Sequence, residues 1–216
     1  MNATIRRAVF FDFDGVLFDT VREAYAVAMV AIGNSVQIAD IDFNSRYFEK
    51  FSQCRYLIGP AWNYYYLMRS IYKDYAHSTA DLEVEYKNSL DQRIHGEHHS
   101  FEENFFQARK KIRETERDNW LSLISPYSIV EDVRVLMSEF KGQFFLVTTR
   151  DRESVMDLLA LHNLDIPEFN IFTKKEYALY NSKVNIIQDL IGKHQIEKSL
   201  FIDDLEEHLE SCGTIE

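Results

Sequence analysis

Cysteines, basic residues and long apolar runs are all scarce in this sequence. It has two cysteines and no CxxC pair, so we expect no disulfide framework and a reducing, cytoplasmic location. No stretch approaches the roughly 18 apolar residues of a membrane span, so no membrane association is expected. Lysine and arginine number 24 against 35 acidic residues, a net charge of −11, which argues against a nucleic-acid partner because such binding rests on basic patches.

What is present is enough to build a core, since hydrophobic residues make up 46% of the chain. Four short apolar runs, at 7–13, 143–149, 169–173 and 199–204, are continuous rather than alternating. This pattern predicts strands that are covered on both faces, as in a parallel sheet.

Helical patterns separate the last three runs. Apolar stripes at 133–140, 155–159 and 184–191 have the spacing of amphipathic helices, and Gly142 and Gly192 are predicted to lie near helix ends. Strands that alternate with helices predict an α/β fold with a Rossmann-like, doubly wound parallel sheet.

The stretch 21–125 breaks this alternation, because its segments are almost all helical in pattern. We therefore predict an α/β core domain formed by residues 1–20 and 126–216, with an all-α domain of residues 21–125 inserted after the first strand. The predicted boundaries lie near Thr20 and Pro126.

Chemically active side chains follow the predicted strands. In doubly wound folds, ligands bind beyond the carboxyl ends of the strands, so these side chains are expected at one edge of the sheet. They are Asp12, Asp14, Thr148, Thr149, Lys183, Asp203 and Asp204.

Several carboxylates at one edge repel one another, so either some of them are protonated or a cation lies among them. Mg²⁺ prefers oxygen ligands and is commonly held by one or two carboxylates and a phosphate. A lysine supplies a point charge to a phosphate, and a threonine hydroxyl supplies a hydrogen bond. Alternation along the first strand places Asp12 and Asp14 on one face. One can attack phosphorus while the other moves protons.

The motif DFDGVLFD, residues 12–19 with Asp12 first, resembles the first motif of the haloacid dehalogenase-like superfamily of phosphohydrolases. FFLVTT, ending at Thr149, is similar to its second motif, Lys183 resembles its third-motif lysine, and LFIDD, ending at Asp204, resembles its fourth. The inserted helical block is similar to the C1-type cap of that superfamily.

The resemblance implies a role for each position. Asp12 is expected to be the nucleophile and a metal ligand, and Asp14 the general acid and base whose backbone carbonyl also binds the metal. Thr148, with Thr149, and Lys183 are expected to bind the phosphoryl group. Asp203 and Asp204 complete the expected Mg²⁺ site. Together these roles describe a Mg²⁺-dependent phosphatase acting on a small phosphorylated metabolite.

Two alternatives stay open from sequence. A phosphomutase would use the same aspartyl-phosphate, and a non-catalytic binding protein could share the fold. Two positions depart from the superfamily pattern: His208 stands where many relatives carry a further aspartate, and Val184 follows Lys183 where the lysine is often followed by proline.

Three other features have ordinary interpretations beside functional ones. HGEHH, residues 95–99, has metal-ligand spacing, but we interpret it as an exposed loop. The aromatic segment 61–72 is expected to be helix core rather than a substrate platform. Arg46, Arg55 and Arg69 could bind the far end of a substrate, although most of them are expected to be solvated, and Arg150 could face a phosphate.

Overall fold

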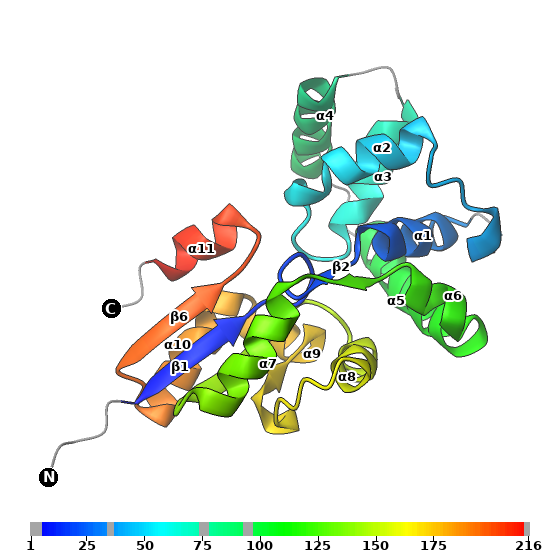
Figure 1. Ribbon diagram of the computed structural model, residues 1–216. Helices are drawn as coiled ribbons and strands as arrows, with labels where there is room; N and C mark the ends of the chain where they lie inside the picture. The colour runs from blue at the N-terminus through cyan, green and yellow to red at the C-terminus, as the bar shows by residue number, and fades with distance from the viewer. Residues whose placement is uncertain (1–5, 34–36, 74–77, 93–96, 214–216) are drawn as a thin grey trace, which may run out of the picture. The chain divides into compact units, whose positions relative to one another are not determined.

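The computed structural model describes residues 6–33, 37–73, 78–92 and 97–213. The chain divides into two compact units: a core unit of Met1–Asp19 and Pro126–Glu216, and a helical unit of Thr20–Ser125. Each unit has its own set of helices, and the four-stranded sheet belongs to the core unit (Figure 1).

The core unit is built on a parallel sheet of four strands in the order β5-β4-β1-β6. The strands are β1 (Arg7–Phe11), β4 (Gln143–Val147), β5 (Ile171–Phe172) and β6 (Lys198–Ile202). Each of the four predicted apolar runs contains a strand. The polar residues at the C-terminal end of each run lie just beyond its strand. The predicted doubly wound α/β fold is confirmed.

Helices cover the sheet on two sides, and Figure 1 shows α7 (Ile129–Glu139) and α10 (Lys183–His194) on opposite faces. The remaining helices of the core unit are α8 (Arg152–Leu161), α9 (Lys174–Tyr180) and α11 (Glu206–Cys212). One buried cluster joins α10 to the sheet, where the rings of Phe10 and Phe145 stack with centroids 5.1 Å apart.

One sequence prediction about the core unit is wrong in detail. The strand β6 is not buried on both faces, because it forms the edge of the sheet and Leu200 is 56% exposed. Gly192 lies near the end of α10 as predicted, and the helix continues to His194 and stops where Gln195 adopts a left-handed conformation with φ of 51°.

The helical unit contains six α-helices among its described residues. They are α1 (Val21–Ala31), α2 (Arg46–Gln53), α3 (Asn63–Lys73), α4 (Thr79–Asp91), α5 (Glu97–Thr115) and α6 (Arg117–Ser122). The helices α5 and α6 are separated at Glu116, whose φ of −135° leaves the helical range, and Trp120 beyond it is fully buried. The first part of HGEHH lies outside the described residues, while its second part begins α5 and is helical rather than a loop.

The centre of the helical unit combines aromatic rings with one buried ion pair. Glu23 is fully buried and accepts hydrogen bonds from Arg109 Nε at 2.7 Å and from Trp120 Nε1 at 3.1 Å. The Tyr64 ring stacks between those of Phe51 and Phe105, and the Arg109 guanidinium lies 4.8 Å from the Phe105 centroid.

A second, two-stranded sheet pairs β2 (Phe18–Asp19) with β3 (Ser125–Pro126), the segments in which the chain passes between the units. None of the described helices is both long enough and apolar enough to cross a membrane.

Candidate active site

Asp12 begins the candidate site, directly after β1. Its backbone N–H donates to the carbonyl of Ile202 at 2.8 Å, so the residue is fixed to the end of the neighbouring strand β6. Its side chain is only 8% exposed. The sheet therefore holds one carboxylate in a buried position at the end of the central strand β1.

Lys183 is the cation that accompanies Asp12. It is the first residue of α10, where the Ser182 side chain caps the helix by accepting from Asn185 N. Lys183 is 3% exposed, and its Nζ lies 2.9 Å from Asp12 Oδ1 and 2.7 Å from Asp203 Oδ2. One ammonium thus bridges two carboxylates that follow different strands.

The Asp203 carboxylate is surrounded by nitrogen donors. Besides Lys183, Leu205 N donates to Oδ1 at 2.9 Å, and His208 Nδ1 lies 3.1 Å from both carboxylate oxygens. Burial would raise the pKa of Asp203, but the hydrogen bond from His208 and the charge of Lys183 outweigh it, so that the pKa is lowered. Asp203 is held as an anion.

The Asp12 carboxyl has the opposite shift. Burial raises its pKa to about 6 against the opposing charge of Lys183, and the negative charges of Asp203 and Asp14 add to the rise. Burial likewise opposes the charged form of Lys183, yet Asp12 and Asp203 raise its pKa. At neutral pH the site therefore contains charged Asp12, Asp203 and Lys183.

Three carboxylates converge at this edge. Oxygen atoms of Asp12, Asp203 and Asp204 lie within 4.8 Å of one another, and Asp204 is the exposed member. A set of carboxylate oxygens is the donor chemistry that Mg²⁺ prefers, so these residues fit the predicted ion. The Asp14 carboxylate is outside this group; its predicted contribution to the metal was its backbone carbonyl.

Gly15 allows Asp204 to approach the chain that follows Asp14. Its φ is +83°, and a Cβ built there would lie 2.0 Å from Asp204 Oδ2. A side chain at residue 15 is thus excluded both by backbone conformation and by contact with Asp204.

Asp14 forms an ion pair that the sequence prediction did not include. Arg150 Nη1 donates to Asp14 Oδ1 at 2.7 Å, and the Arg150 side chain is fully buried. Its guanidinium also lies 5.7 Å from the centroid of the Phe13 ring. Arg150 could have faced a phosphate, but in the structure it binds the carboxylate that is predicted to transfer protons.

The two threonines follow β4 as expected. Thr148 is 1% exposed, donates its N–H to Phe172 O at 2.9 Å, and accepts at Oγ1 from Arg150 N at 3.2 Å. A hydroxyl that accepts one hydrogen bond keeps its own O–H to donate. Thr149 is half-buried beside it.

The structure thus assembles Asp12, Lys183, Asp203 and Asp204 into one connected group. Sequence reasoning missed the contacts of His208 and Arg150. His208 lies in the first turn of α11, five residues after Asp203, and the available signal was the short distance in sequence between the end of β6 at Ile202 and the start of α11 at Glu206.

No protein-family model matches this sequence, and no curated protein does. Solved structures do match. A predicted phosphoglycolate phosphatase from Haemophilus somnus is 13% identical, with 97% of this chain and 83% of that chain covered and a TM-score of 0.56. A haloacid dehalogenase-like hydrolase from Streptococcus pneumoniae is 17% identical, with 97% and 80% covered and a TM-score of 0.52.

A predicted phosphatase from Clostridium acetobutylicum is 12% identical, with 92% of this chain and 76% of that chain covered and a TM-score of 0.51. At these identities the comparison concerns the fold. The chain has the fold of the haloacid dehalogenase-like hydrolases.

Proposed function

We propose that this protein is a Mg²⁺-dependent phosphatase that hydrolyses a small phosphorylated metabolite through an aspartyl-phosphate on Asp12. The observation that carries the proposal is the buried Asp12 carboxylate, placed against Lys183 and within 4.8 Å of Asp203 and Asp204 oxygens. The fold supports it, since structures with this fold are described as hydrolases and predicted phosphatases.

Asp12 acts as the nucleophile. With a pKa of about 6 it is mostly ionised at neutral pH, and burial removes water that would otherwise solvate the attacking oxygen. A carboxylate oxygen forms a bond to phosphorus while the bond from phosphorus to the ester oxygen breaks. The Lys183 ammonium, 2.9 Å from Asp12, stabilises the negative charge of the phosphoryl group during the transfer.

Asp14 moves the protons in both half-reactions. It gives a proton to the departing ester oxygen, and then takes one from the water that attacks the phosphorus of the aspartyl-phosphate. The second step releases phosphate and restores the Asp12 carboxylate. Arg150 keeps the Asp14 carboxylate in place through the 2.7 Å ion pair.

Asp12, Asp204 and the backbone carbonyl of Asp14 would hold Mg²⁺, with Asp203 beside them. When bound, the ion neutralises phosphate charge and offsets repulsion among these carboxylates. The Thr148 hydroxyl is the proposed hydrogen-bond donor to a phosphate oxygen, with Thr149 beside it.

A phosphomutase would form the same aspartyl-phosphate and return the phosphoryl group to substrate. Free phosphate released from simple monoesters distinguishes hydrolysis from that reaction. A non-catalytic binding protein with this fold would release none.

The test is a phosphate-release screen over phosphorylated metabolites, including phosphoglycolate, with and without EDTA. We expect turnover with Mg²⁺, loss of turnover with EDTA, and recovery when Mg²⁺ is restored. Asp12→Asn should abolish turnover, and the matched variant Asp165→Asn, at an exposed position, should retain it. Turnover that is indifferent to chelation would refute the metal requirement, and an active Asp12→Asn variant would refute the nucleophile.

A further inference from the structure

A buried arginine connects the ends of two strands at the candidate site. Arg150 follows Thr148 and Thr149 beyond the end of β4, and its side chain is fully buried. Its Nη1 donates to Asp14 Oδ1 at 2.7 Å, and Asp14 lies beyond the end of β1, the strand that pairs with β4. The guanidinium therefore crosses from the end of one strand to the end of its neighbour.

The backbone and the side chain of Arg150 are both held in place. Its N–H donates to Thr148 Oγ1 at 3.2 Å, and its carbonyl accepts from Lys174 N at 3.0 Å. Its guanidinium lies 5.7 Å from the centroid of the ring of Phe13, which is fully buried and precedes Asp14. Because a cation is attracted to the face of an aromatic ring, this contact helps to hold the guanidinium against Asp14.

The ion pair selects the oxygen of Asp14 that carries a proton. A guanidinium has five N–H donors and no acceptor, so Oδ1, which accepts from Arg150 Nη1, is not the protonated oxygen. A proton on Asp14 therefore belongs on Oδ2. The position of Arg150 in this way fixes the direction from which Asp14 gives a proton.

The leaving group of the substrate decides whether that direction matters. The alkoxide of an ordinary alcohol is a strong base, and it leaves readily only when it takes up a proton as its bond to phosphorus breaks. A phenolate that carries a nitro group is a much weaker base and leaves without that proton.

We propose that Arg150 makes the site competent for phosphate esters of alcohols, by holding Asp14 so that Oδ2 protonates the departing oxygen. This inference rests on the proposed function, because it takes Asp12 as the nucleophile and Asp14 as the proton donor. An Asp12 oxygen bonds to phosphorus, and the ester oxygen departs with the electron pair of its bond to phosphorus and takes the proton of Asp14. Arg150 is a positioning residue that acts through Asp14.

The test compares 4-nitrophenyl phosphate with 4-nitrobenzyl phosphate, which differ by one methylene group and in the basicity of the leaving oxygen. The measured quantity is kcat/KM, which reports transfer of the phosphoryl group to Asp12. We expect the wild type to hydrolyse both esters. Arg150→Met should lose about 10²-fold on 4-nitrobenzyl phosphate, the lower end of what a positioned proton donor contributes, and should change little on 4-nitrophenyl phosphate.

Inhibition by inorganic phosphate separates positioning from phosphate binding. Arg150→Met keeps the backbone N–H that donates to Thr148, so the inhibition constant should not change. Arg150→Lys, which keeps the cation, should recover part of the activity on 4-nitrobenzyl phosphate. In an Asp14→Asn background, Arg150→Met should have no further effect on either ester, because residues that act as one unit are not additive.

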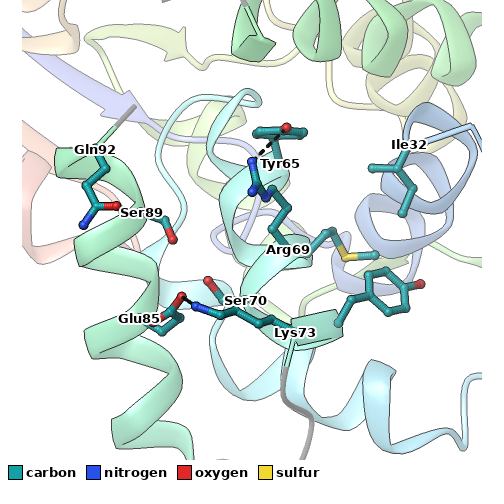
Figure 2. Close-up of a pocket in the computed structure, with 10 residues that line it drawn as sticks. Ile32, Tyr65, Arg69, Ser70, Lys73, Glu85, Ser89 and Gln92 are labelled. Atoms are coloured by element: carbon teal, nitrogen blue, oxygen red, sulfur yellow. Dashed lines mark hydrogen bonds and ion pairs between the residues drawn. The ribbon is translucent and has the colours of Figure 1, made fainter. Parts of the chain in front are cut away.

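Two controls remove cations from other ion pairs. Arg152→Met removes a guanidinium that lies 3.4 Å from Glu176. Lys73→Met breaks the 2.7 Å pair with Glu85 in the helical unit, where both residues line a cavity of about 500 Å³ (Figure 2). Neither control should change the ratio of the kcat/KM values for the two esters, and a change as large as that of Arg150→Met would refute the inference.

If circular dichroism shows that Arg150→Met is unfolded, Arg150→Gln, which keeps an N–H donor without the charge, replaces it with the same expectation. The inference is wrong if an active wild type does not hydrolyse 4-nitrobenzyl phosphate, or if the variant loses activity equally on both esters. It is also wrong if the loss persists in the Asp14→Asn background, or if phosphate inhibition weakens in parallel, which would make Arg150 a phosphate contact. A wild type that releases no phosphate from any monoester would refute the proposed function itself, and this inference with it.

Discussion

Asp12 shows how a functional carboxylate opposes stability. Its pKa of about 6 in the folded chain exceeds the reference of 3.8 because burial disfavours the charge. The folded state therefore binds the Asp12 proton more tightly than the unfolded state. The contribution of Asp12 to the free energy of unfolding therefore falls as pH rises from about 4 to about 6, and it stays constant above pH 6.

Asp12→Asn should therefore stabilise the metal-free protein. We expect the free energy of unfolding at neutral pH to rise on the order of 1–3 kcal/mol, since a pKa unit corresponds to about 1.4 kcal/mol. Chemical denaturation in EDTA measures the change. The control Asp165→Asn, at an exposed position, should leave stability unchanged. A less stable Asp12→Asn protein would show that Lys183 more than offsets the cost of burial.

Gly15 permits a second test at the residue scale, because Gly33 is a matched control. Both have positive φ, +83° and +91°, but a Cβ at Gly15 would meet Asp204 whereas a Cβ at Gly33 has nothing within 4 Å. Gly15→Ala and Gly33→Ala should both lose stability through backbone strain, by about 1 kcal/mol. Only Gly15→Ala should also weaken Mn²⁺ binding, measured by electron paramagnetic resonance. Equal Mn²⁺ affinity in both variants would mean that Asp204 is not a ligand.

At the scale of elements, the strand ends were predictable and the side-chain pairings were not. The apolar runs and the acids after them are local in sequence, and parallel strands bring their ends together. The Arg150–Asp14 and His208–Asp203 contacts depend on side-chain direction across separate elements. Local patterns do not encode that direction.

The helix α10 and the strand β6 show two ways in which the spacing of apolar residues failed to predict which side chains are buried. The buried face of α10 carries Lys183, Ile186, Ile187 and Leu190. The predicted stripe began at Val184 and so missed that Lys183 lies on the inward face. A continuous apolar run predicted β6 to be covered on both faces, but an edge strand has only one neighbour and Leu200 is exposed.

The first turn of α11 places His208 beside a predicted metal ligand. His208 Nδ1 lies 3.1 Å from the Asp203 carboxylate, so we expect His208 to orient Asp203. His208→Ala should weaken Mn²⁺ binding about 10- to 100-fold, as for other residues that position metal ligands. His208→Asn places an amide N–H near the original Nδ1 and should restore much of the affinity, whereas His208→Gln should not.

Thermal denaturation monitored by circular dichroism checks that the His208 variants remain folded. Equal Mn²⁺ affinity across the wild type and all three variants would show that Asp203 needs no support from α11.

At the scale of the whole molecule, the helical unit depends on a buried ion pair. Glu23 and Arg109, with side chains 0% and 6% exposed, join α1 to α5, and Trp120 of α6 donates to the same carboxylate. Removing one member of such a pair leaves the other charge buried without its counter-charge, which costs about 3–5 kcal/mol.

Glu23→Gln should therefore destabilise the helical unit. Hydrogen exchange should accelerate across α1, α5 and α6 with little change at β1 and β4. The control is Glu85→Gln, since its partner Lys73 is 71% exposed and the pair is worth no more than about 1 kcal/mol. Uniform acceleration over both units would show that they unfold as one cooperative body.

The pairing of β2 with β3 has a consequence for how such a protein can be altered. Paired strands lie about 4.8 Å apart, so the chain enters and leaves the helical unit at adjacent points. A turn of a few residues could join those points without displacing either strand. The sequence of the helical unit can therefore be replaced, lengthened or grafted onto another protein. The sheet that carries the carboxylates keeps its own connections in each case.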